Sequence, residues 1–152
     1  MKTDRSKEDC LIGILQRRTA NMSSRGSVAK NGHVGTDQYN TVEVLPSGAK
    51  VLEGNKGFHT LPDYSHSPNA VYVKFNASKN FVTLRFYGAD HRMYLEIAYH
   101  PEPNLGKPGV PVWHYHVYGP DLKHDNVYLV TNEIIQKYGK YLEDVGYGTK
   151  FA

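Results

Sequence analysis

The stretch VTLRFYGADHRMYLEIAYH, residues 82–100, decides the fold class. Its two halves alternate apolar and polar side chains with the period of two that is typical of β-strands. In the first half, Leu84 and Phe86 lie on the apolar face. In the second half, Met93 and Leu95 do. GADH, residues 88–91, forms a turn signal between them. Matching the two apolar faces predicts an antiparallel hairpin in which Phe86 pairs with Met93 and Leu84 with Leu95.

The opposite face of this hairpin is polar. A third strand, predicted over Val112 to Tyr118, repeats the alternation, with Trp113 on its apolar side. If the three strands are neighbours, one sheet surface gathers an unusual density of acid–base groups and aromatic side chains. On this face we expect Arg85, Tyr87, Tyr94, Glu96, His100, His114, His116 and Tyr118, with Arg85 and Glu96 as diagonal neighbours.

The remaining elements are shorter. Residues 41–45 and 49–52 flank Pro46-Ser47-Gly48, which is a hairpin signal, and strands are also predicted over 71–75 and 126–130. Thr131 or Asn132 would cap a final helix that runs to about Glu143. A capping box at Ser6 predicts another helix to about Arg18.

These elements predict an α+β fold, with a small central antiparallel sheet and a helix near each terminus. Residues 1–38 are expected to be an N-terminal helix and linker arm, and residues 39–152 the functional domain. The Ser-, Gly-, Asn- and Lys-rich composition between about residues 19 and 40 is typical of a linker.

Composition bounds the function classes. The chain has 152 residues, of which 39% are apolar and 22% charged, as in an ordinary globular domain. No apolar run approaches the roughly 18 residues of a membrane span, and the N-terminus has no signal-peptide pattern. A net charge of +3 permits a nucleic-acid substrate without requiring one. The single cysteine, Cys10, excludes a disulfide framework within the chain.

Histidines on one face can supply a general base and a general acid together, because imidazoles titrate near neutrality. Metal-independent RNA cleavage needs such a pair, and the leading hypothesis pairs His100 with His114 or His116. Arg85 would bind phosphate and stabilise the transition state, and Glu96 would orient a histidine or act as base. No cofactor is expected.

Other interpretations stay open. The sequence His-x-His with a third histidine also suits a Zn²⁺ site, which would make the protein a metal-dependent nuclease or hydrolase. A non-enzymatic module that binds a metal or a partner is the third possibility. Arg85 and Glu96 could form only a cross-strand ion pair. His33, His91 and His124 are interpreted as surface or hydrogen-bonded residues.

Four fragments also resemble a known family. FHTLPDYSHSPN (58–69), LRFYGAD (84–90), LEIAYHP (95–101) and VWHYH (112–116) are similar to C-terminal toxin domains of LXG-type polymorphic toxins of Gram-positive bacteria. Those domains commonly carry an Arg-(aromatic)-Tyr strand, an acidic strand and a late His-x-His. Many are thought to be ribonucleases, often with the small sheet of barnase- and EndoU-like folds. The resemblance covers residues 57–120, and no LXG secretion domain is present in the chain.

The resemblance implies a set of site positions and partners. It carries over Arg85, Glu96, His100, His114 and His116 as active-site residues, and adds His59 and Asp63 beside the substrate. Tyr87, Tyr94 and Tyr118 would contact substrate from the same face. The implied partners are RNA and a cognate immunity protein. Such a domain is secreted as part of a larger protein and acts in the cytoplasm of a target cell.

Overall fold

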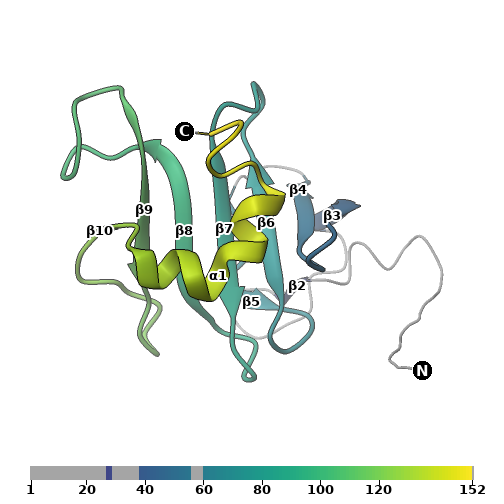
Figure 1. The fold of residues 1–152 in the computed structure, drawn as a ribbon. Helices are drawn as coiled ribbons and strands as arrows, with labels where there is room; N and C mark the ends of the chain where they lie inside the picture. Colours follow the sequence, from purple (N-terminus) through teal and green to yellow (C-terminus); the bar gives the residue numbers. More distant parts are fainter. Residues whose placement is uncertain (1–26, 29–37, 56–59, 152) are drawn as a thin grey trace.

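A computed structural model describes residues 27–28, 38–55 and 60–151. Within these ranges one helix packs against a seven-stranded sheet (Figure 1). The elements in chain order are β2 (Ser27–Val28), β3 (Tyr39–Val44), β4 (Lys50–Gly54), β5 (Tyr64–Ser65), β6 (Val71–Phe75), β7 (Val82–Tyr87), β8 (Met93–Pro101), β9 (Pro111–Val117), β10 (Tyr128–Leu129) and α1 (Asn132–Asp144). The α+β class is therefore confirmed.

The large sheet has the strand order β10-β9-β8-β7-β6-β4-β3. Every neighbouring pair is antiparallel except β4 and β6, which run parallel. The predicted hairpins over 41–52 and 82–100 and the strands near 71–75, 112–118 and 126–130 are all present. The mostly antiparallel sheet follows from this succession of hairpins. The predicted helix over Ser6–Arg18 lies outside the described residues.

The register of the central hairpin differs from the prediction by two residues. Leu84 pairs with Ile97 and Phe86 with Leu95, and Arg85 therefore stands directly opposite Glu96 instead of diagonally. Two local features cause the difference. The connection comprises residues 88–92, one residue more than predicted, and is closed by Gly88 N–H donating to the Arg92 carbonyl at 3.0 Å; the register also shifts by one residue just beyond Phe86. A bulge of this kind inserts one extra residue into a strand and reverses the alternation of faces beyond it.

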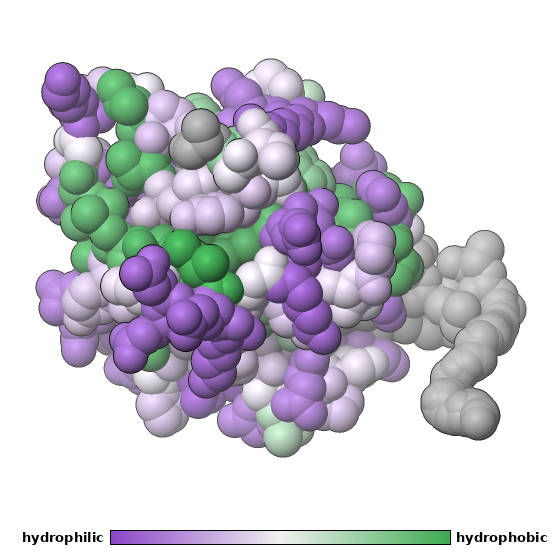
Figure 2. Space-filling model, in the orientation of Figure 1, coloured by the Kyte–Doolittle hydropathy of each residue, from purple (hydrophilic) through white to green (hydrophobic). Residues whose placement is uncertain are grey.

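Helix α1 covers one face of the sheet. It begins where predicted: Thr131 is the N-cap, and its hydroxyl oxygen accepts from the Ile134 N–H at 3.3 Å. Tyr138 and Leu142 are buried against the sheet, as the helical periodicity predicts. The larger apolar core lies in this layer and includes Val73, Leu84, Phe86, Leu95, Ile97, Trp113 and Phe151. Hydrophilic side chains gather on the outer side of α1, and apolar ones reach the surface beside it (Figure 2).

The other face of the sheet is partly covered by the segment that contains β5. A second apolar cluster, made of Tyr39, Leu52, Leu61, Tyr72, Tyr87 and Met93, fills this layer. Tyr87 donates its hydroxyl hydrogen to the Pro62 carbonyl. Short strand β2, inside the predicted arm 1–38, pairs with β5. Among the described residues, no helix is long and apolar enough to cross a membrane.

Candidate functional site

The polar face is a grid in which the strand register places side chains in rows. One row runs Tyr72–Arg85–Glu96–His116 across β6, β7, β8 and β9. The next row runs Lys74–Thr83–Ala98–His114. Neighbouring strands in a sheet lie about 4.8 Å apart, and successive residues on one face of a strand about 6.7 Å apart. The sheet itself therefore sets the spacing of the polar groups.

Arg85 and Glu96 form a closely hydrogen-bonded ion pair at one end of the grid. Arg85 Nε and Nη2 both donate to Glu96 Oε2, at 2.9 and 2.6 Å. Arg85 Nη1 donates to the Leu61 carbonyl at 2.6 Å and to that of Pro62 at 3.3 Å. The side chains of Arg85 and Glu96 are only 11% and 12% exposed. Arg85 therefore orients Glu96 and anchors the 61–62 backbone, and Glu96 Oε1 accepts no hydrogen bond from the described residues.

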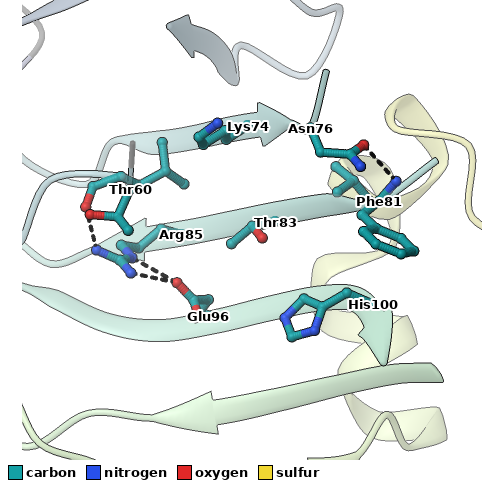
Figure 3. A pocket seen from close by; sticks show the side chains of 10 residues that line it. Thr60, Lys74, Asn76, Phe81, Thr83, Arg85, Glu96 and His100 are labelled. Carbon is teal, nitrogen blue, oxygen red and sulfur yellow. Dashed lines mark hydrogen bonds and ion pairs between the residues drawn. The ribbon is translucent and has the colours of Figure 1, made fainter. Parts of the chain in front are cut away.

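A hollow of about 310 Å³ opens beside this ion pair (Figure 3). Its lining comes from three adjacent strands and from the segment at Thr60 and Leu61. Lys74 of β6, Thr83 of β7 and His100 of β8 all border it, together with Glu96. A carboxylate, an imidazole and an ammonium group thus share one concave site. Sites of this size and mixed lining are typical of small-ligand binding.

His100 has a defined hydrogen-bonding state. Its Nδ1 lies 2.9 Å from the Pro101 carbonyl oxygen, and a carbonyl can only accept, so Nδ1 carries the hydrogen. The other nitrogen, Nε2, then presents its lone pair in the neutral ring. Glu96 and His100 are four residues apart on β8, which corresponds to about 13 Å between their Cα atoms. Thr83 lies on the neighbouring strand between these two levels.

His114 and His116 are buried, in contrast to the exposed histidine surface that the sequence predicted. His114 is 0% exposed and His116 9%. Burial lowers the pKa of His114 below its ordinary value of 6.5. Burial also lowers the pKa of His116, and the nearby His124 adds to the effect. The two rings therefore favour the neutral form at neutral pH.

The same histidines define a candidate metal-binding group. One ring nitrogen of His114, one of His116 and a carboxylate oxygen of Glu102 all lie within 4.8 Å of one another. His114 Nε2 and His116 Nδ1 are buried and have no hydrogen-bond partner among the described residues. The ring of His100 contacts that of His114, with 4.6 Å between centroids, but His100 does not belong to this group of ligands.

The residues that were predicted to contact substrate lie in different environments. Tyr94 packs on the helix side with the larger core, so its predicted place on the polar face is wrong; the bulge shifts it there. Tyr87 is on the predicted face, but it is only 2% exposed and covered by the second cluster. Tyr118 packs beside the His116 ring, and burial raises its pKa to about 12. Asp63 Oδ1 lies 3.7 Å from Arg85 Nη1. His59 lies outside the described residues.

Sequence reasoning missed three residues of this face. Lys74 was not assigned to the site, although the alternation in VYVKF places it one row above Tyr72. Glu102 lies just after β8, and the path of the loop brings its carboxylate close to His114 and His116. His124 lies beside His116, with 4.2 Å between ring centroids, although the sequence suggested only a surface or hydrogen-bonded residue. Only the pairing of β6 with β7 and the loop paths could have revealed these positions.

Comparison of the chain with protein-family models, with curated proteins and with solved structures gave no match. The geometry of the polar face is therefore what indicates a function. Its elements are the oriented Glu96 carboxylate, the hollow beside it and the buried histidine group.

Proposed function

We propose that the chain is a ribonuclease that cleaves RNA in the hollow bordered by Glu96, His100 and Lys74, without metal in the cleavage step. The observation that carries the proposal is the shared lining of that hollow: a carboxylate, an imidazole and a cation from three adjacent strands. These are the groups that 2′-hydroxyl attack on a phosphodiester requires.

The reaction would divide the proton transfers between the two ends of the hollow. Glu96 Oε1 takes the proton of the ribose 2′-hydroxyl, and the 2′-oxygen attacks the phosphorus. The bond from phosphorus to the 5′-oxygen breaks, and protonated His100 donates its Nε2 hydrogen to that oxygen. The products are a 2′,3′-cyclic phosphate and a 5′-hydroxyl end.

Two cations have different tasks in this proposal. Lys74 supports charge on the non-bridging phosphate oxygens, because it borders the hollow one strand away from Thr83. Arg85 is a positioning residue, because its hydrogen bonds to Glu96 and to backbone carbonyls hold the carboxylate in one orientation. The hypothesis that Arg85 itself binds phosphate is therefore replaced by one in which Lys74 does so.

The test is cleavage of a short RNA by the purified full chain. We expect products with 2′,3′-cyclic phosphate ends and no cleavage of an oligonucleotide that carries a 2′-deoxy sugar at the cut site. Glu96→Gln keeps an acceptor for Arg85 but removes the base, so it should slow cleavage by about 10²–10⁴-fold. His100→Gln should do the same. Glu43→Gln, a change at an exposed position on β3, is the matched control.

Inactive wild-type chain, or equal rates in wild type and in folded Glu96→Gln and His100→Gln variants, would refute the assignment. Melting curves establish that each variant is folded. Lys74→Met should weaken RNA binding and slow cleavage, and the remaining products should still carry 2′,3′-cyclic phosphate ends. Cleavage of DNA as well as RNA would favour a metal-dependent nuclease instead.

The biological setting follows from the resemblance to toxin domains. The proposed enzyme would act in a target cell, and the producing cell would protect itself with a cognate immunity protein. Expression of the wild-type chain should then arrest growth of a host that lacks this protein, while Glu96→Gln should be tolerated. Normal growth of a host that accumulates folded, RNA-cleaving wild-type chain would contradict the toxin role.

A further inference from the structure

We propose that Glu102, His114 and His116 form a binding site for a divalent transition-metal ion of the Zn²⁺ type, separate from the cleavage hollow. The site would join the loop after β8 to strand β9. A fourth ligand from outside these three residues, such as water, would complete the coordination of the ion, and the proposal does not depend on ribonuclease activity.

The first observation is the unpartnered nitrogen of a fully buried ring. His114 is 0% exposed, and its Nε2 has no hydrogen-bond partner among the described residues. A buried acceptor without a partner costs about 1–3 kcal/mol. Metal coordination would satisfy this nitrogen, and the same holds for the buried Nδ1 of His116.

The second observation is the orientation of His114. Its Nδ1 lies 2.9 Å from the Val112 carbonyl oxygen, so Nδ1 donates and Nε2 presents its lone pair. Metal-binding histidines almost always donate their other ring N–H to a carbonyl or carboxylate in this way. The backbone of β9 thus holds His114 in the tautomer that a metal requires.

The third observation is the carboxylate. Glu102 Oε1 accepts from both the backbone N–H and the side-chain amide of Asn104, at 3.2 and 3.1 Å. These bonds orient the carboxyl group. Because Glu102 is only partly buried and lies on a loop, its side chain can move toward the rigid histidines.

The distances allow an ion with a small adjustment. The three donor atoms lie within 4.8 Å of one another. Around tetrahedral Zn²⁺, with bonds of about 2.0–2.1 Å, donors stand roughly 3.3 Å apart. The donor atoms must therefore approach one another by about 1.5 Å at most.

The ligand types select the metal. Two imidazoles and one carboxylate suit Zn²⁺, whereas Mg²⁺ and Ca²⁺ prefer oxygen ligands alone. None of the three ligands lines the cleavage hollow. Metal binding and RNA cleavage can therefore be measured independently.

The experiment titrates Zn²⁺ into metal-free full-length chain, with any affinity tag removed and no RNA present. Calorimetry should show one ion per chain, and the melting temperature should rise with Zn²⁺ but not with Mg²⁺. Glu102→Gln should weaken binding at least 10-fold and His114→Gln at least 100-fold. Exposed-residue controls Glu43→Gln and His66→Gln should bind as the wild type does.

If His114→Gln fails to fold, the partly exposed Glu102→Gln still decides the matter, together with X-ray absorption of the zinc-loaded wild type. The X-ray absorption spectrum should show a zinc ion that is coordinated by two imidazole nitrogens and a carboxylate oxygen. No Zn²⁺ binding by the wild type, or unchanged affinity in folded Glu102→Gln, would overturn the proposal. Active ribonuclease without zinc binding would reject this site alone, and zinc binding by an inactive chain would reject only the ribonuclease.

Discussion

Replacing Arg85 by methionine removes the cation that holds two parts of the polar face together. Four hydrogen bonds are lost, two to Glu96 Oε2 and two to the carbonyls of Leu61 and Pro62. The variant leaves Glu96, whose side chain is 12% exposed, as a largely buried charge with its main partner gone. Removing one member of a buried ion pair typically costs about 3–5 kcal/mol of unfolding free energy. For a chain of this size we expect a melting temperature lower by about 6–20 °C.

Urea unfolding followed by tryptophan fluorescence measures this cost. The only tryptophan, Trp113, is 8% exposed and packs against Tyr99 and Phe151, so its emission should report loss of the core. Glu96→Gln removes the partner's charge and keeps its shape. The losses of unfolding free energy in the two single variants should therefore add up to about 1–3 kcal/mol more than the loss measured in the double variant.

A loss below about 1 kcal/mol in Arg85→Met would refute this account, because a solvent-exposed ion pair contributes no more than that. Additive losses in the double variant would show that Arg85 and Glu96 do not interact in solution. Arg85→Lys is a useful intermediate. Lysine keeps the charge but lacks the planar fork, so it should restore only part of the stability.

Two further predictions concern the helix. Leu142→Ala should lower the unfolding free energy by about 2–5 kcal/mol in urea titrations, because Leu142 is 1% exposed in the larger core; a change below 1 kcal/mol would mean that α1 is not packed as described. Thr131→Ala should cost about 1 kcal/mol through loss of the N-cap hydrogen bond to the Ile134 N–H, whereas Thr131→Asn, with another good capping side chain, should stay close to wild type.

The sequence alone was sufficient to predict the elements that depend on local patterns of residues. Alternation within residues 82–87 and 95–100 defines strands with one apolar face, because side chains in a strand point to opposite sides in turn. Pro46-Ser47-Gly48 predicts a hairpin, and Thr131 predicts the start of α1. The same alternation correctly placed Arg85, Glu96, His100, His114 and His116 on one side of the sheet.

Tertiary structure decided what depends on register and on loops. The longer connection and the one-residue shift beyond Phe86 together move the pairing by two residues and bring Arg85 opposite Glu96, and the shift also turns Tyr94 to the helix side. Alternation could not show this, because a two-residue change in pairing keeps the same apolar face in contact over Leu84–Phe86, and a bulge leaves no signal in the period-two pattern. Burial of His114, the approach of Glu102 to it and the place of Lys74 at the hollow depend on contacts between segments distant in sequence. Such contacts arise only when the sheet and its loops pack together, so no local pattern encodes them.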